Sequence, residues 1–189
     1  AASDNDEKFV EALAATYNVP FYVKSFDTNT IAATTKKSIE ETARDLRYDW
    51  FEVLRAENKF DCIITAHHAD DNIETVMMNF FRGTGIKGLR GILPEHNKII
   101  RPLMFARRYE LEAFTTTNNL AFVTDHTNAE NDFTRNYFRN TILPLVSERY
   151  PEAKENILKN IQRFTETEIL YRQSIDLHIK KLTEPKGNE

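Results

Sequence analysis

Two histidines and three carboxylates gather at residues 67–74, where an apolar run gives way to a helical pattern. His67, Asp71 and Glu74 are spaced i, i+4 and i+7, so a helix beginning near His67 would place them on one face. Ligands bind at the carboxyl ends of strands in open α/β sheets, so this position favours a functional site. The surrounding elements are the apolar run Cys62-Ile63-Ile64 and a helical pattern of Ile73, Val76, Met77 and Phe80.

Three interpretations of this cluster are open. It could be a solvated helix start, in which Asp70 and Asp71 offset the positive end of the helix dipole. It could be a metal site, because histidine and carboxylates at helical spacing are ordinary ligands of Zn²⁺ or Mg²⁺. It could also be a nucleotide or polar-substrate site, in which the carboxylates hold Mg²⁺ or a substrate amine.

Charge is unevenly distributed along the 189 residues, whose formal net charge is −4. Residues 1–75 contain 8 basic and 15 acidic side chains, a net charge of −7. Residues 82–108 contain 7 basic side chains against Glu95 alone, a net charge of +6. A basic segment in an acidic protein is a candidate phosphate-facing surface, although scattered solvated charge is also common.

Cys62 is the one cysteine, so no disulfide within the chain and no Cys-x-x-Cys motif is available. This usage is typical of a reducing cytoplasm, where we expect the protein. No apolar run has the length of a membrane span, and no signal-peptide pattern is seen at Ala1.

Strand-like and helical patterns alternate over the first two thirds of the chain. The patterns predict helices over 3–17, from Ser38, from about 68 and over 107–119. They also predict one long helix with Pro151 in its first turn and an apolar stripe from Ile157 to Leu182. They predict strands over 21–26, 61–66 and 120–124, a polar loop over 29–37 and irregular structure over the glycine-rich residues 82–91. This alternation predicts an α/β fold with a parallel sheet. Because the first helix has no strand before it, we expect the sheet to begin upstream of Ala1.

A second group of polar residues follows at 125–139. Arg135 and Arg139 are one helical turn apart, where two like charges repel unless an anion or carboxylate joins them. They would form an anion clamp, or pair on the surface with nearby acidic side chains. Arg44 and Arg47 raise the same question earlier in the chain, where local pairing is the stronger alternative.

Taken together, these residues resemble the tRNA(Ile)-lysidine synthetase family of PP-loop ATP pyrophosphatases over roughly residues 1–150. Six motifs occur in order: Ala43-Arg44-x-x-Arg47-Tyr48, Ala66-His67-His68-Ala69-Asp70-Asp71-x-x-Glu74-Thr75, Arg82-Gly83-Thr84-Gly85-x-x-Gly88-Leu89, Arg101-Pro102-Leu103, Asp125-x-x-Asn128 and Arg135-Asn136-x-x-Arg139. Each motif is weak by itself, and the set in register is specific.

The resemblance implies an adenine nucleotide alpha hydrolase-like, Rossmann-like domain over 1–148 and a helical connector over 149–189. It implies that ATP and Mg²⁺ activate the C2 carbonyl of the wobble cytidine in a tRNA(Ile) with a CAU anticodon, and that free lysine displaces AMP. It implies catalytic roles for Asp71, Glu74, Arg47 and Arg139, with Asp71 also a Mg²⁺ ligand. It implies nucleotide contacts for His67, Arg82, Gly83 and Gly85, and substrate or tRNA contacts for Arg135, Asp125, Asn128 and Arg101.

The chain departs from this family in one respect. The phosphate-binding signature Ser-Gly-Gly-x-Asp-Ser is absent from these residues and is expected upstream of Ala1. The chain alone is therefore expected to bind ATP very weakly and to have no catalytic turnover.

Three alternatives are also open. One is a PP-loop enzyme that thiolates tRNA, which the lone Cys62 disfavours because such enzymes commonly use cysteine pairs. The others are a metal-dependent hydrolase built on His67, Asp71 and Glu74, and a non-catalytic RNA-binding module. A homodimer is left open.

Overall fold

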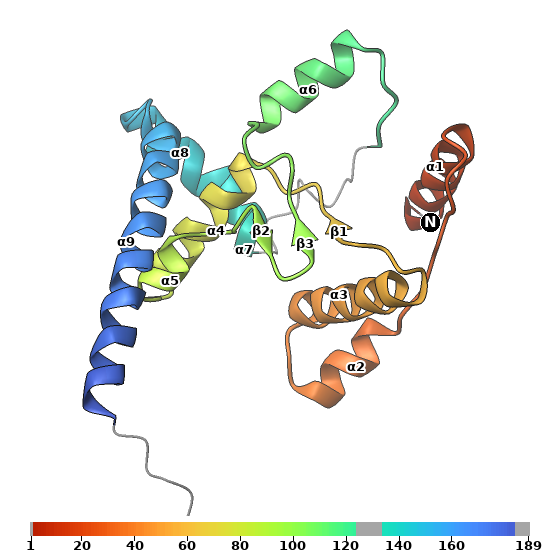
Figure 1. Cartoon of the computed structure of the whole chain (residues 1–189). Coiled ribbons are helices and arrows are strands. Elements are labelled where there is room, and N and C mark those ends of the chain that lie inside the picture. Colours follow the sequence, from red (N-terminus) through yellow and green to blue (C-terminus); the bar gives the residue numbers. More distant parts are fainter. Residues whose placement is uncertain (1, 124–133, 184–189) are drawn as a thin grey trace, which may run out of the picture. The chain divides into compact units, whose positions relative to one another are not determined.

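Two groups of elements make up the part of the chain that the structure describes, residues 2–123 and 134–183 of a computed structural model. The first unit comprises residues 2–64, 97–100 and 120–123, and the second comprises residues 65–96, 101–119 and 134–183. Helices predominate over short strands in both (Figure 1). None of the helices in these described ranges has the length and apolar content that a membrane crossing requires.

Three helices form most of the first unit: α1 (Ala2–Thr16), α2 (Thr28–Thr35) and α3 (Ile39–Glu57), with α2 packed beside α3 (Figure 1). Strand β1 (Ile63–Ile64) pairs in parallel with β3 (Ile99–Ile100), and Ile63 lies opposite Ile99. The helix predicted from Ser38 is confirmed together with its cap. The Ser38 hydroxyl accepts a 3.1 Å hydrogen bond from the N–H of Glu41.

Two predicted strands and one predicted loop in this unit are wrong. The strand predicted over 21–26 does not form, and neither does one in the described residues of 120–124. A strand needs a hydrogen-bonding neighbour, and β1 finds its neighbour in β3, which the patterning did not predict. Most of the polar loop predicted over 29–37 is helix α2. The Asp27 carboxylate caps this helix, because it accepts hydrogen bonds from the N–H and the hydroxyl of Thr30 at 3.2 and 2.6 Å.

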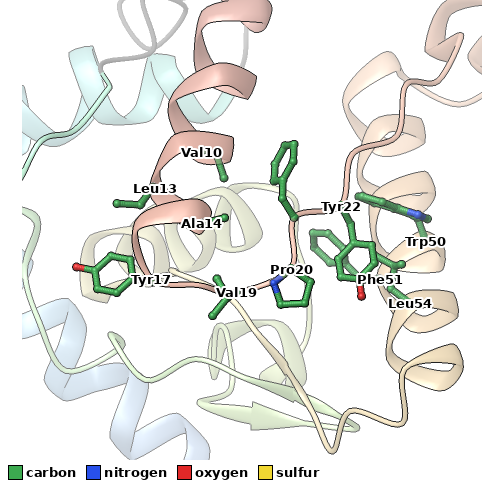
Figure 2. A pocket seen from close by; sticks show the side chains of 11 residues that line it. Val10, Leu13, Ala14, Tyr17, Val19, Pro20, Tyr22, Trp50, Phe51 and Leu54 are labelled. Carbon is green, nitrogen blue, oxygen red and sulfur yellow. The ribbon is translucent and has the colours of Figure 1, made fainter.

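An apolar pocket of about 680 Å³ opens in the first unit between α1, the segment that follows it and α3 (Figure 2). Its lining carries no charged side chain and includes Val10, Leu13, Tyr17 and Trp50. A lining without a charged side chain offers no cation to bind a phosphate. The charged groups with functional geometry lie in the second unit.

Helix α4 (Ala69–Phe81) is the central helix of the second unit. It contacts α5 (Ile86–Leu89), α7 (Thr134–Tyr137), the π-helical turn η2 (Phe138–Ile142) and α9 (Ala153–Leu182). Its Ile73 and Glu74 are the most deeply buried large side chains among the described residues, at 0% and 1% exposure. The unit is completed by β2 (Glu95–His96), α6 (Arg108–Thr117) and α8 (Leu143–Arg149).

The long C-terminal helix is confirmed, although α9 begins at Ala153 and not at Pro151, and it packs on α4 and α5 (Figure 1). Contacts therefore group α9 with residues on both sides of position 148. The division into a domain over 1–148 and a connector over 149–189 stays a prediction.

The glycine-rich segment 82–91 contains the short helix α5 and packs against α4. Gly83 and Gly91 have φ values of +72° and +68°, which glycine adopts readily and other residues rarely do. A methyl group on Gly91 would lie 2.0 Å from the side-chain oxygen of Asn72, which accepts a 2.7 Å hydrogen bond from the N–H of Ile92. The close approach at Gly91 is therefore to α4.

Candidate functional site

The first turn of α4 is fixed by a reciprocal pair of hydrogen bonds. The N–H of His68, the residue before the helix, donates to Asp71 Oδ2 at 2.9 Å, and the N–H of Asp71 reaches His68 Nδ1 at 3.4 Å. Because the helix begins after His68, His67 is not on its face, and its Nδ1 lies 2.9 Å from the Thr65 hydroxyl. The predicted shared face is wrong for His67 and confirmed for Asp71 and Glu74, which are three residues apart within α4.

Arg139, from the π-helical turn η2, meets both of these carboxylates. Its Nε and Nη2 donate to the two oxygens of Glu74 at 2.6 and 2.9 Å, and its Nη2 also lies 3.4 Å from Asp71 Oδ1. Two parallel bonds from one guanidinium to one carboxylate fix the geometry of both groups as well as their charge. Burial alone would lower the pKa of Arg139, but the hydrogen bond and charge of Glu74, with the charge of Asp71, raise it above its ordinary value.

Arg135 brings a second guanidinium to the same carboxylate. Its Nε is 3.9 Å from Glu74 Oε2 and its Nη2 donates to the Thr75 hydroxyl at 3.1 Å. Its Nε is buried and has no hydrogen-bond partner among the residues that the structure describes. The structure therefore brings together Asp71, Glu74, Arg135 and Arg139, with Glu74 innermost.

Two carboxylates and two guanidinium groups in one cluster can bind a zwitterion. A ligand carboxylate can take the place of a protein carboxylate against an arginine fork, and a ligand ammonium can then bind the displaced carboxylate. An α-amino acid carries both groups on one carbon. The arrangement suits a free amino acid better than a phosphate, since an isolated phosphate would face Asp71 and Glu74.

A second ionic cluster lies one residue away and was missed by sequence reasoning, which counted Arg107 only as part of the basic segment. Arg107 Nε lies 3.2 and 3.1 Å from the two oxygens of Asp70, and its Nη2 lies 3.0 Å from Oδ1. Its Nη1 donates to Glu155 of α9 at 2.6 Å. Burial by itself raises the pKa of Asp70, but the hydrogen bonds from Arg107 and from the backbone of Arg108 lower it below its ordinary value.

Several predicted site residues are not brought to this cluster. Arg82 and Gly83 follow the far end of α4, and Gly85 caps α5. With a rise of about 1.5 Å per residue, the length of α4 separates them from Asp71 by roughly 16 Å. Arg101 is buried and its Nη1 donates to the Leu93 carbonyl at 2.8 Å.

For three other predicted site residues, the structure gives no position relative to this cluster. Asp125 and Asn128 lie outside the described residues. Arg47 lies on α3, in the first unit, where the neighbouring Arg44 stacks on the Tyr48 ring at 5.0 Å. Roles for these residues stay predictions.

Metal-ligand geometry is absent from the described ranges, where no three histidine, cysteine or acidic side chains come together in a way that could hold an ion. His67, Asp71 and Glu74 therefore do not form a three-ligand site. The metal-dependent hydrolase suggested by their spacing loses its structural basis, because the spacing assumed a helix that included His67.

Comparison with known proteins places these observations in a family. Residues 1–146 match the family model described as the PP-loop domain. The chain is 44% identical over 183 residues to a tRNA(Ile)-lysidine synthase of Chlorobaculum tepidum, covering 97% of this chain and 54% of that protein. It is 37% identical over 185 residues to one of Bacteroides thetaiotaomicron, covering 98% of this chain and 43% of that protein.

A tRNA(Ile)-lysidine synthase of Thermosipho africanus is 35% identical over 175 residues, with 93% of this chain and 41% of that protein covered. The chain thus spans about half the length of the curated relatives it matches. The PP-loop match implies an α/β fold of the adenine nucleotide alpha hydrolase type, and the described residues are rich in helix with a small sheet. Since the family model covers more than three quarters of its residues, the chain belongs to the PP-loop domain family of ATP-binding proteins.

Proposed function

We propose that the protein carrying this chain is a tRNA(Ile)-lysidine synthase, which joins free lysine to the wobble cytidine of a tRNA(Ile) with a CAU anticodon. The observation that carries the proposal is the ion cluster of Asp71, Glu74, Arg135 and Arg139, whose charges complement an amino acid. The names of the relatives support the same activity.

In this reaction the C2 carbonyl oxygen of cytidine attacks the α-phosphorus of ATP, and pyrophosphate leaves. The ε-amine of lysine then attacks C2, and AMP leaves with the former carbonyl oxygen. The lysine ammonium has to lose a proton before it attacks, which calls for a nearby carboxylate. We assign Asp71 to an ammonium group of lysine and Arg139 to its α-carboxylate, and we assign Glu74 the task of holding Arg139 in place through their two hydrogen bonds.

This assignment follows from burial. Glu74 is 1% exposed and already paired with Arg139, so it serves as the fixed inner anchor. Asp71 is 14% exposed and makes only a 3.4 Å contact with Arg139, so it is the carboxylate that a ligand ammonium reaches first. Arg135, whose Nε lies 3.9 Å from Glu74 and makes no hydrogen bond within the described part of the chain, supplies a further positive charge for the lysine carboxylate.

ATP would be bound by other parts of the protein, and we propose nucleotide contacts for His67, Arg47, Arg82, Gly83 and Gly85. Asp71 would contribute a carboxylate oxygen to a Mg²⁺ ion that accompanies ATP. When bound, Mg²⁺ neutralises phosphate charge as pyrophosphate leaves.

The tRNA would lie against the exposed basic side chains of segment 82–108, which are Arg82, Lys87, Lys98 and Arg108 and suit a phosphate backbone. Asp125 and Asn128 remain candidates for contacts with tRNA or substrate. Arg101, being buried, would act by holding the loop from Leu93. Since tRNA, ATP and free lysine meet in the cytoplasm, we propose that location.

The test is ATP-dependent incorporation of labelled lysine into a tRNA(Ile) transcript with a CAU anticodon, catalysed by the full-length gene product. Asp71→Ala and Glu74→Ala are expected to abolish incorporation. Glu112→Ala, which removes an exposed partner of Arg108 on α6, is the matched control and is expected to retain it. A transcript with uridine at the wobble position should accept no lysine.

No incorporation by a folded wild-type protein would overturn the proposal. Equal incorporation by Asp71→Ala and Glu112→Ala would leave the activity standing and remove the assigned site.

A further inference from the structure

Two adjacent aspartates begin α4, and their side chains have different partners. Successive helical residues point about 100° apart. Asp71 turns toward the His68 N–H and Arg139, and Asp70 turns toward Arg107. The lysine-binding role proposed above uses only Asp71, which leaves the buried pair of Asp70 and Arg107 without an assigned task.

We infer that Arg107 is a positioning residue for lysine binding, which acts through Asp70 to hold the first turn of α4 with Asp71 aimed at the ligand. The inference rests on the proposed function.

The segment 106–108 makes several hydrogen bonds to the first turn of α4. Three contacts of 3.0–3.2 Å join the Arg107 guanidinium to the Asp70 carboxylate. The backbone N–H of Arg108 donates to Asp70 Oδ2 at 2.8 Å, and the N–H of Ala69 donates to the Ala106 carbonyl at 2.9 Å. The Arg107 and Asp70 side chains are only 13% and 16% exposed, so water screens this pair weakly.

Loss of Arg107 would change the charge pattern of the neighbouring site. Asp70 would keep its carboxylate without the guanidinium that neutralises it. Its charge already acts on Arg139, together with those of Glu74 and Asp71. An uncompensated Asp70 would therefore compete for Arg139 and loosen the turn that carries Asp71, and both effects weaken the binding of lysine more than that of ATP.

Glu155 is the outer member of the cluster. It accepts a 2.6 Å hydrogen bond from Arg107, but its side chain is 52% exposed. A pair this exposed contributes less than a buried one, so the three residues have a predicted order of importance. Arg107 and Asp70 should matter most for lysine binding and Glu155 least.

The experiment measures lysine and ATP saturation of the full-length gene product in the incorporation assay. Arg107→Gln is expected to raise KM for lysine roughly tenfold, the equivalent of one charge-assisted hydrogen bond, and to change KM for ATP much less. Arg107→Lys keeps the charge but not the fork and should recover part of the loss. Glu155→Gln should change KM for lysine by less than about threefold.

Arg90→Gln is the matched control for lost packing. Arg90 donates to Glu168 of α9 at 3.0 Å, and the two side chains are buried to a similar degree, at 16% and 7% exposure. It should lower the unfolding temperature without raising KM for lysine selectively. The double variant Asp70→Asn with Arg107→Gln should be no worse in KM for lysine than the worse single variant, because both remove one interaction.

A selective rise in KM for lysine in Arg107→Gln, absent from Arg90→Gln, supports the inference. An unchanged KM for lysine, or equal rises for lysine and ATP in both variants, overturns it while leaving the proposed function intact. If Arg107→Gln does not fold, KM for lysine and for ATP can be measured in Asp70→Asn and Arg107→Lys instead, with the same expected selectivity. Absence of incorporation by the wild-type protein is a different result, since it removes the proposed function itself.

Discussion

The guanidinium of Arg139 and the carboxylate of Glu74 lie 65 residues apart in sequence and are joined by two hydrogen bonds of 2.6 and 2.9 Å. Glu74 is on the central helix of the second unit, and Arg139 is in the π-helical turn. The pair therefore ties two elements together at the same place where it offers charge to a ligand. Changes to either residue should affect both stability and activity.

Glu74→Ala should destabilise the protein strongly, because it leaves the Arg139 guanidinium without its main partner. Removing one member of a buried ion pair costs about 3–5 kcal/mol. Thermal unfolding of the full-length gene product should show a clear drop in Tm. Glu112→Ala breaks an exposed pair with Arg108 and should cost about 1 kcal/mol or less. Equal drops in Tm for the two variants would contradict the burial argument.

Arg139→Lys should impair lysine use more than it impairs folding. A lysine ammonium keeps the charge near Glu74 but cannot make two parallel hydrogen bonds to one carboxylate. We expect KM for lysine to rise roughly tenfold in the incorporation assay, the loss of about one charged hydrogen bond. Arg163→Lys, at an exposed position of α9, is the control for the same exchange. An unaltered KM in Arg139→Lys would argue against its contact with the ligand.

The stabilising effect of Asp70 should depend on pH in a defined direction. Its pKa is lowered in the folded protein, because the hydrogen bonds from Arg107 and Arg108 outweigh the effect of burial. A lowered pKa contributes stability that is fully present above the unfolded value of about 3.9 and is lost as pH falls through the folded value. The difference in unfolding free energy between wild type and Asp70→Asn should therefore be constant near neutral pH and shrink below about pH 4.

Gly91 and Gly83 provide a matched pair for backbone strain. Both have positive φ, of +68° and +72°, which costs an L-residue roughly 1–2 kcal/mol. A methyl group at Gly83 meets open space, whereas one at Gly91 would press on Asn72 at 2.0 Å. Gly91→Ala should therefore lower Tm more than Gly83→Ala, as thermal unfolding would measure. Equal losses would mean that the contact with Asn72 yields easily.

Sequence patterns predicted the residues of the ion cluster better than their surroundings. Asp71, Glu74, Arg135 and Arg139 were all singled out, since each is a charged residue at helical spacing beside a recognisable motif. The bond between Asp70 and Arg107 was not predicted, because the two are 37 residues apart and no local spacing connects them. Only the folded chain brings the start of α6 to the start of α4.

The elements themselves show where local patterns are insufficient. The aromatic run at 21–26 has the composition of a strand but no strand partner, and Ile99–Ile100 takes the place beside β1. Residues 29–37 look like a loop until the two bonds from Asp27 to Thr30 are considered. Strand formation depends on distant partners, whereas a cap acts within one turn, so the second error was avoidable from sequence and the first was not.

The π-helical turn at Phe138–Ile142 has a consequence for residue counting. A π-turn spans one residue more than an α-turn, so helical phase shifts by about 100° across it. Residues of α8 are therefore out of phase with Thr134–Tyr137, and a helical wheel drawn through the whole segment misplaces one half. Any homologue that lacks this one residue would have to present its arginine from a different position in the helix.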